Sequence, residues 1–209
     1  MNNEDALAGM VPDVSRETYD RLEQYSELVL KWNPTINLIS KSSINQIWER
    51  HILDSAQIFS CVRSSEKWAD LGSGGGFPGI VAAVLAFGSG WTTRFTLVES
   101  DQRKAAFLRN AGRELGLNIN VTADRIEQIL PMRADVLTAR ALAPLSDLLG
   151  FASRHLVPDG TAIFPKGRTA AEEVLKARQD WVFDLTETPS KTDPDAKLLM
   201  IKGIARAET

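Results

Sequence analysis

The chain has 209 residues, of which 44% are hydrophobic and 24% charged, and its formal net charge is −3. This composition is typical of a globular protein and excludes collagen-like, disordered and disulfide-rich classes. The longest apolar run, residues 80–87, is far shorter than the roughly 20 residues that cross a bilayer. The N-terminus shows no signal-peptide pattern, so we expect a cytoplasmic protein that does not bind membranes. One cysteine, Cys61, and two histidines predict neither a disulfide nor a metal site.

Charge is distributed unevenly along the chain. Residues 1–30 contain seven acidic and two basic side chains, whereas residues 101–168 contain ten basic and seven acidic ones. The net negative charge argues against avid, non-specific binding of nucleic acid, which depends on many lysine and arginine contacts to phosphate. The basic second half still permits one basic face, although a solvated surface is the commoner meaning of such a bias.

Residues 1–65 are predicted to form a helical extension. Apolar side chains recur at helical spacing over residues 19–32, with Ser15 as the N-cap, and the pattern predicts a break at Asn33-Pro34. A second helix is expected to follow, because residues 44–59 place their apolar side chains on one stripe.

From Trp68 onward, short β-rich runs alternate with helical stretches, which predicts a doubly wound α/β domain over residues 66–209. The expected parallel strands are Trp68–Leu71, Phe95–Glu99, Asn118–Thr122, Asp135–Ala139 and Thr161–Phe164. The expected helices between and after them are Pro78–Phe87, Gln102–Leu115, Pro144–Arg154 and Thr169–Asp180. Two last runs, Trp181–Leu185 and Leu198–Ile204, leave no room for a helix between them, so they predict an antiparallel hairpin. The result is a mixed, mostly parallel, seven-stranded sheet.

The strongest local signal is the sequence WADLGSGGGFPGI at residues 68–80. A strand leads into a glycine loop that includes Gly72 and Gly74, and Pro78 is well placed to begin the next helix. Glycines let the backbone turn sharply and approach a ligand, and a helix N-terminus offers unpaired N–H groups to it. Asp70 ends this strand, at the edge where open α/β sheets bind ligands.

Glu99 ends the second predicted strand, 29 residues after Asp70. A carboxylate at this position can accept hydrogen bonds from both ribose hydroxyls of an adenosine. The alternative is a tight strand-to-helix turn in which the carboxylate only caps the backbone.

Residues 74–79 formally match GxGxxG, which alone would suggest a dinucleotide. Three observations argue against NAD. The charge of Asp70 would oppose a pyrophosphate. The only tyrosines, Tyr19 and Tyr25, precede the sheet, so they cannot form the Tyr-x-x-x-Lys catalytic pair of an NAD enzyme. The terminal strand pair fits methyltransferases better. S-adenosylmethionine carries an amino group, a sulfonium and no phosphate, which suits an acid-flanked glycine loop. The loop therefore indicates a methyltransferase site.

Several segments together resemble one enzyme family in their order and spacing. They are NLISKSSINQIWERHILDS, DLGSGGGFPGI, LVESDQRKAAFLR, ADRIEQI, TARALAPLSDLL and FPKG. The family is the bacterial 16S ribosomal RNA guanine-N7 methyltransferase, also called glucose-inhibited division protein B, and the resemblance covers about residues 19–204. The RHILDS segment and the arginine after the fourth strand, Arg140, are more specific than the glycine loop.

This resemblance implies a Rossmann-like class I methyltransferase with S-adenosyl-L-methionine as cofactor. The substrate it implies is a guanine of 16S ribosomal RNA, or of the small ribosomal subunit, near the decoding site. The implied cofactor contacts are Gly72, Phe77, Ile126, Glu127 and Arg140, with Glu99 at the usual ribose position. One departure is Gly75, where many members have proline, which alters the stiffness of the loop. We expect a monomer without an obligate protein partner.

Two of these positions also have structural interpretations. Ile126 and Glu127 follow the third predicted strand, where an adenine usually lies, but Asp124 could instead cap a helix there. Arg140 ends the fourth predicted strand, where its planar group of donors can face phosphate, base or the cofactor carboxylate. The alternative for Arg140 is a structural ion pair with Asp70 or Glu99.

His51 and Asp54 lie three residues apart on one predicted helix and are therefore neighbours. They could form a catalytic couple, but we favour a buried polar pair that docks the extension on the sheet. With Arg140 they are candidates for positioning. Lys166 could contact RNA phosphate or cap a strand end. The candidate RNA contacts are Arg103, Lys104, Arg125, Arg140 and Lys166.

Guanine N7 has an in-plane lone pair and no proton, so methyl transfer to it needs no base. The chemistry requires in-line positioning, and no catalytic residue can be named from the sequence. The target base must leave its stack to reach the methyl group. Two other functions remain open, namely a small-molecule methyltransferase and a non-catalytic regulator that binds an adenosyl cofactor.

Overall fold

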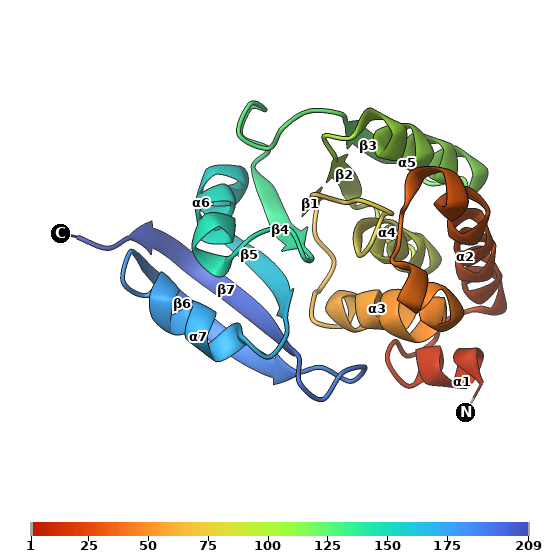
Figure 1. The fold of residues 1–209 in the computed structure, drawn as a ribbon, viewed down its shortest axis with the longest axis horizontal. Coiled ribbons are helices and arrows are strands. Elements are labelled where there is room, and N and C mark those ends of the chain that lie inside the picture. Colours follow the sequence, from red (N-terminus) through yellow and green to blue (C-terminus); the bar gives the residue numbers. More distant parts are fainter. Residues whose placement is uncertain (1, 209) are drawn as a thin grey trace.

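A seven-stranded sheet forms the centre of the computed structural model, which describes residues 2–208 (Figure 1). The strand order is β3-β2-β1-β4-β5-β7-β6, and β7 runs antiparallel to both of its neighbours. The strands are β1 (Lys67–Leu71), β2 (Arg94–Val98), β3 (Ile119–Thr122), β4 (Ala134–Ala139), β5 (Leu156–Lys166), β6 (Trp181–Pro189) and β7 (Lys197–Arg206). The predicted mixed, mostly parallel sheet is confirmed.

The position of the site follows from the order of β1 and β4. The strand order reverses between these two strands, so their carboxyl ends border a crevice where α/β proteins bind ligands. The register of the pair is fixed at the opposite end, where Asp135 Oδ2 accepts the backbone N–H groups of Glu66 (2.9 Å) and Lys67 (2.8 Å). Four of the five residues of β1 are buried, as expected for a strand covered on both faces.

Helices cover both faces of the sheet. On one face lie α4 (Gly79–Gly88) and α5 (Gln102–Glu114), and on the other α6 (Leu145–His155) and α7 (Ala170–Ala177) (Figure 1). The N-terminal extension packs outside α4 and α5 and shares one buried apolar cluster with them. It consists of α1 (Asn3–Ala8), α2 (Arg16–Ile36), a 3-10 turn η1 (Lys41–Gln46), a π-helical turn η2 (Trp48–Leu53) and α3 (Asp54–Phe59). No helix of residues 2–208 has the length and hydropathy needed to span a membrane.

The predicted helix break at Asn33-Pro34 is wrong, because α2 continues to Ile36. Pro34 lacks the N–H that would bind the Leu30 carbonyl, but it lies in the last turn, so the helix has only two more residues to form after it. The helix ends at Asn37, whose left-handed backbone (φ 49°) is the usual conformation after a helix C-terminus.

The predicted second helix over residues 44–59 is divided into η1, η2 and α3. The apolar stripe itself is present, since Ile52, Ala56 and Phe59 are buried. Because 3-10, π and α turns contain different numbers of residues, side chains in these three segments point in directions that a single α-helix would not give. A π-helical turn within a helix often lies at a functional site. The terminal hairpin is also longer than predicted, and only residues 190–196 connect its strands.

Gly88 shows how closely the extension packs on α4. A Cβ at this position would lie 2.1 Å from Thr18 Oγ1 and 3.0 Å from Thr18 Cγ2 on α2. We expect Gly88→Ala to lower the free energy of unfolding by about 1–3 kcal/mol, because the two helices must separate. Gly167→Ala is the control, since a Cβ added at Gly167 would have no atom within 4 Å. Equal urea midpoints for the two variants would contradict this packing argument.

Candidate active site

The loop between β1 and α4 turns at three glycines with positive φ angles, Gly72 (62°), Gly74 (57°) and Gly76 (93°). Residues other than glycine rarely adopt a positive φ, because their Cβ clashes with the backbone. Space is also limited, because a Cβ at Gly72 would lie 2.6 Å from Leu142 Cδ1 and one at Gly76 would lie 2.6 Å from Tyr25 Oη. The backbone angles and the close approaches thus both require glycine here.

Glu99 binds the backbone around this loop. Its Oε2 accepts the N–H of Gly74 and its Oε1 accepts the N–H of Asp101, each at 2.8 Å. The carboxylate is therefore a backbone cap, which is the structural alternative considered from the sequence. Each carboxylate oxygen has more than one acceptor site, so this capping leaves capacity for hydroxyl donors from a ligand.

Asp70 lies under the loop and is 1% exposed. Its carboxylate accepts the hydroxyl of Thr138 (2.7 Å) and the N–H of Gly79 (3.3 Å), which ties β4 and the start of α4 to β1. Burial raises the pKa of Asp70 to about 6, although hydrogen bonds from Thr138 and Gly79 oppose this shift. In this structure Asp70 supports the loop from below and does not line the adjacent pocket.

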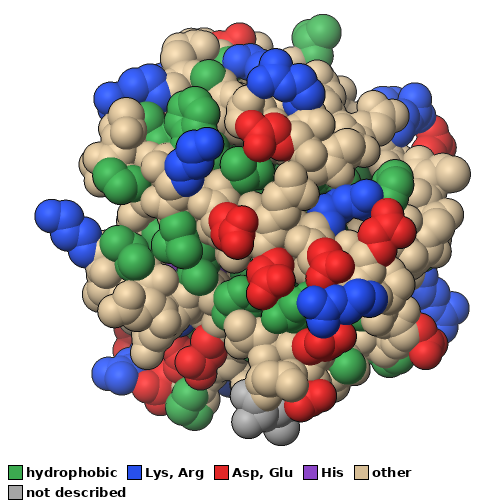
Figure 2. All heavy atoms as spheres, turned by 90° about the vertical axis from the view of Figure 1, so that its right-hand side faces the viewer, with side chains coloured by type: hydrophobic (Ala, Val, Ile, Leu, Met, Phe, Trp, Pro, Cys, Tyr) green, Lys and Arg blue, Asp and Glu red, His purple; other side chains and the backbone are tan. Residues whose placement is uncertain are grey.

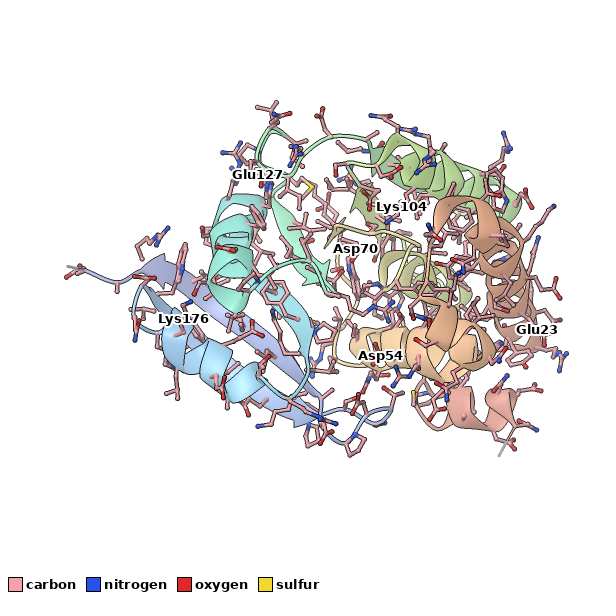
Figure 3. The ribbon with its side chains drawn as sticks, viewed as in Figure 1. Glu23, Asp54, Asp70, Lys104, Glu127 and Lys176 are labelled. Carbon is pink, nitrogen blue, oxygen red and sulfur yellow. The ribbon has the colours of Figure 1, made fainter. Side chains whose placement is uncertain are left out.

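A pocket of about 830 Å³ opens beside the loop, and we call it the glycine-loop pocket. It brings together these residues singled out in the sequence: Gly72, Gly74, Glu99, Lys104, Arg125, Ile126 and Glu127. In Figure 3, Lys104 and Glu127 lie above the level of Asp70, and Asp54 lies below it. The sequence argument missed Leu142, Phe151, Trp181 and Arg206, which line the same pocket from the segment after β4, from α6 and from the hairpin.

The segment with Ile126 and Glu127 is a short turn, so the alternative considered from the sequence, a helix capped by Asp124, is absent from this described stretch. Two side chains at the end of α6 hold the turn. His155 Nε2 lies 3.3 Å from the carbonyl oxygen of Ile126, and Arg154 Nη2 donates to that of Ile129 at 2.8 Å. His155 was not singled out from the sequence, because only the tertiary structure brings it under this turn.

Arg140 lies behind the glycine loop, where it binds the N-terminal extension. Its Nη1 contacts Asp54 Oδ2 and the Arg50 carbonyl oxygen, both at 3.1 Å, and its Nη2 lies 2.8 Å from His51 Nδ1. The guanidinium carbon also lies 5.3 Å from the centre of the Phe77 ring. The ion pair suggested with Asp70 or Glu99 is therefore wrong, since the partner of Arg140 is Asp54. Neither Phe77 nor Arg140 lines the glycine-loop pocket.

His51 and Asp54 each bind Arg140, which lies between them. This is the docking of the extension that we favour from the sequence, although it passes through a third side chain. Burial, followed by the nearby Arg140 and Arg50 cations, lowers the pKa of His51 to about 3. The ring is neutral, its Nδ1 accepts from Arg140, and its Nε2 therefore donates to Ser43 Oγ (2.9 Å). With both ring nitrogens engaged, His51 is arranged to orient Arg140 and not to take up a proton.

A second pocket, of about 740 Å³, lies on the other side of Arg140, and Ala141 lines both pockets. We call it the Arg140 pocket. Its walls come from η2, from the ends of β4 and β5, and from the β6–β7 loop. Ala141 has a left-handed backbone (φ 52°), and non-glycine residues with this strain often lie at functional sites.

Lys166 supports the segment between the two pockets. Its Nζ donates to the Ala143 carbonyl oxygen and to Glu173 Oε2, both at 2.8 Å. Glu173 Oε2 also accepts the N–H of Leu145 at 2.8 Å, so the segment after Arg140 is held at two points. Lys166 lines the Arg140 pocket, whereas Arg103 lies on α5 and lines neither pocket.

Gln57 anchors the β6–β7 loop, which forms the far wall of the Arg140 pocket, and no sequence pattern indicated this role. The side chain is 3% exposed, and its Oε1 accepts the N–H of Lys191 at 2.9 Å. Its Nε2 lies within hydrogen-bond distance of Asp54 Oδ1 (2.9 Å), Ser190 Oγ (3.0 Å) and Thr192 Oγ1 (3.1 Å). The β6–β7 loop is thereby attached to the extension. Within residues 2–208, no group of three or more His, Cys, Asp or Glu side chains is placed to hold a metal ion.

Comparison with known sequences identifies one family. Residues 18–199 match the GidB family, described as rRNA small subunit methyltransferase G. A Ruegeria sp. (strain TM1040) protein named Ribosomal RNA small subunit methyltransferase G is 52% identical over 202 residues, or 97% of this chain and 98% of that protein. A protein of the same name from Rhodospirillum centenum is 49% identical over 193 residues, or 92% of this chain and 87% of that protein.

Solved structures share the fold at low sequence identity. A SAM-dependent O-methyltransferase from Thermotoga maritima has a TM-score of 0.54 and 17% identity, covering 74% of this chain and 66% of that chain. The PH0226 protein from Pyrococcus horikoshii OT3 has a TM-score of 0.60 and 12% identity, covering 85% of this chain and 98% of that chain. The predicted Rossmann-like class I methyltransferase fold is thus confirmed.

The buried carboxylate under the loop predicts a particular pH dependence. Because the folded pKa of Asp70 is raised from 3.8 to about 6, the stability provided by its neutral form is complete below pH 3.8 and is lost as the pH rises through 6. Asp70→Asn cannot ionise. Its free energy of unfolding minus that of the parent protein should therefore rise by about 2 kcal/mol between pH 4 and pH 7. Urea titrations across this range test the difference, and parallel stability profiles would contradict it.

Proposed function

The chain belongs to the family of rRNA small subunit methyltransferase G, and from this membership we propose that it methylates N7 of a guanine in 16S ribosomal RNA. The protein is an S-adenosylmethionine-dependent methyltransferase, as the family and the fold together require. The observation that carries the specific proposal is the pair of pockets that meet at Ala141, beside the crevice between β1 and β4. The glycine-loop pocket suits the cofactor, and the Arg140 pocket suits the guanine base.

The glycine-loop pocket fits S-adenosylmethionine in size and chemistry. Its volume of about 830 Å³ lies within the range of ligand pockets, roughly 300–1,000 Å³. Gly72 and Gly74 line it without side chains, and Glu99 offers two oxygens for ribose hydroxyls. Ile126 and Phe151 provide apolar surface for the adenine. Acidic and basic side chains line the pocket in equal number, which suits a ligand that carries an ammonium, a sulfonium and a carboxylate; they are Glu99, Asp124, Glu127 and Asp147, and Lys104, Arg125, Arg154 and Arg206.

The Arg140 pocket is the proposed site of the target guanosine. Residues of η2 and of the β6–β7 loop line it, and Ala141, next to Arg140, also lines the glycine-loop pocket. A base that has left its stack could enter here with its N7 directed at Ala141. Arg50 and Arg168 also line this pocket and are placed to contact the phosphates on either side of the base.

Methyl transfer to N7 requires the protein mainly to align the base with the methyl group. When bound, the cofactor supplies an electrophilic methyl group on its sulfonium. Guanine N7 has a lone pair in the plane of the ring and carries no proton, so no side chain would have to remove a proton from it. This agrees with His51, whose pKa of about 3 and two engaged nitrogens leave it no part as a base. Arg140 and Lys166 instead fix the segment that separates the two pockets.

RNA should approach from the side of the two pockets. Figure 2 views the side of the molecule on which α2 lies, at the right of Figure 1, and this side carries many acidic side chains among basic ones. Glu17, Asp20, Glu23 and Glu27 are exposed along α2 there. On the pocket side, Lys104 and Arg125 line one pocket and Arg140 and Lys166 line the other. The proposal includes a monomer, since residues of one chain line both pockets, and a cytoplasmic location, because the proposed substrate is ribosomal RNA.

A direct test uses labelled S-adenosylmethionine with unmodified 16S ribosomal RNA made by transcription, and with the small subunit assembled on it. We expect the label in one guanine, located by cleavage at N7-methylguanine. Label at another atom or in another base would overturn the assignment to N7. A protein that binds the cofactor but methylates neither form of the RNA would favour a small-molecule methyltransferase or a regulator.

Glu99→Ala should weaken cofactor binding. The change removes the acceptor for ribose hydroxyls and also frees the Gly74 N–H that Glu99 holds. Loss of hydrogen bonds to a charged group predicts an increase in the cofactor Kd of about 10- to 100-fold, measured by calorimetry. Glu66→Ala is the control, because Glu66 is an exposed acid whose ion-pair partner is Arg94. Unchanged affinity in Glu99→Ala would show that Glu99 only supports the fold.

Comparing Arg125→Ala with Lys166→Ala should distinguish a side chain that only contacts RNA from one that also holds the segment after Arg140. Arg125 is exposed, so its loss should reduce the salt slope of RNA binding by about 1. Because Arg125 also lines the glycine-loop pocket, the cofactor Kd should be measured alongside, and it should rise less than in Glu99→Ala. Lys166→Ala should in addition lower kcat, because the Ala143 carbonyl and Glu173 lose their shared donor. RNA titrations at several salt concentrations and turnover at saturating substrates measure the two effects. An unchanged salt slope in both variants would place the RNA on a different face.

A further inference from the structure

The glycine loop has a second face, which contacts the N-terminal extension. Gly72 and Gly74 line the glycine-loop pocket, whereas Gly75 and Gly76 face α2 and the segment that follows it. A Cβ at Gly75 would lie 3.0 Å from the Leu38 carbonyl oxygen. One side of the loop is thus available to a ligand, and the other is packed against residues that the methyltransferase sheet does not supply.

Tyr25 makes the directional contact on this second face. It lies on α2, is fully buried, and donates its hydroxyl to the Gly75 carbonyl oxygen at 2.5 Å. Its ring packs 5.2 Å from that of Phe77, at the end of the same loop. Burial raises the pKa of Tyr25 well above its ordinary value, so the hydroxyl keeps its proton and remains a donor.

The loop is therefore held from two opposite sides. Glu99, at the end of β2, accepts the Gly74 N–H, and Tyr25 donates to the Gly75 carbonyl. Four of the five residues from Gly72 to Gly76 are glycines, which have more conformational freedom than any other residue. A segment of this composition has little stiffness of its own, so its shape depends on these outside contacts.

We propose that Tyr25 is a positioning residue that holds the glycine loop in the conformation that binds S-adenosylmethionine. The inference rests on the proposed function for the identity of the ligand. A ligand that binds only one loop conformation has an apparent Kd equal to its intrinsic Kd divided by the populated fraction of that conformation. Removing the hydroxyl lowers this fraction and leaves the pocket lining unchanged.

Tyr25→Phe tests the proposal, because it removes one oxygen atom and keeps the ring against Phe77. Tyr19→Phe is a matched control on the same helix. Tyr19 is also buried, but its hydroxyl lies 3.5 Å from Glu23 Oε1, and its ring stacks on Trp48 instead of the loop. Calorimetry with S-adenosylmethionine and with S-adenosylhomocysteine gives the Kd, and thermal unfolding reports any general loss of stability.

We expect Tyr25→Phe to raise the Kd for both ligands by about 3- to 10-fold and Tyr19→Phe to leave it unchanged. In the RNA assay, Tyr25→Phe should raise the KM for S-adenosylmethionine, with the kcat at saturating cofactor and the KM for RNA retained. A merely structural tyrosine would change the melting temperature without this selective change. An unchanged Kd in Tyr25→Phe, or an equal increase in Tyr19→Phe, overturns the proposal.

Failure of the proposal for Tyr25 can be distinguished from failure of the proposed RNA methylation. If the parent protein binds the cofactor but does not methylate RNA, the binding measurements still decide the part played by Tyr25. If the parent protein does not bind the cofactor, both proposals fail. Amide hydrogen exchange of residues 72–76 gives an independent measurement, because the proposal requires faster exchange in Tyr25→Phe than in Tyr19→Phe.

Discussion

The arrangement of both pockets depends on the largely buried cation of Arg140. The Arg140 and Asp54 side chains of this ion pair are 18% and 17% exposed, so water compensates the charges only in part. Taking a charge out of water costs several kcal/mol unless hydrogen bonds and an opposite charge offset the loss. Asp54, the Arg50 carbonyl and His51 provide this compensation, and all three come from the η2–α3 segment of the extension. The end of β4 is therefore completed only when the extension is docked.

The N-terminal extension that docks at Arg140 also contacts the glycine loop on one side and the β6–β7 loop on the other. On one side, the same extension places Tyr25 and Leu38 against the back of the glycine loop. On the other side, Gln57 of α3 binds the loop between β6 and β7, which is distant in the chain. The extension thus contacts both the support of the pocket proposed for the cofactor and a wall of the pocket proposed for the base. It is better regarded as part of the proposed active site than as a separate appendage.

Much of this architecture could be predicted from local patterns in the sequence. Alternating β-rich and helical runs predict the sheet, and the absence of a helix between the last two runs predicts the antiparallel hairpin. The parts that could not be predicted depend on contacts distant in sequence. Periodicity cannot show that Asp70 is buried beneath the loop, nor that Arg140 pairs with Asp54 instead of Asp70. The break expected at Pro34 failed for a local reason, since a proline in the last turn removes a single hydrogen bond.

The charges around the Arg140 pocket are suited to a product that carries positive charge. Methylation at N7 makes the guanine ring cationic, and unpaired cations beside it would oppose the reaction. Three of the four basic side chains that line this pocket have a carboxylate partner: Arg140 with Asp54 (3.1 Å), Lys166 with Glu173 (2.8 Å) and Arg168 with Asp195 (2.8 Å). The fourth, Arg50, is exposed and forms no ion pair within the described residues, so its charge is screened by water. Each pair retains N–H donors for a phosphate or a base edge, while the carboxylate reduces the positive potential at the ring. The pocket can therefore bind an anionic RNA backbone without a strong field against the charge that forms at N7.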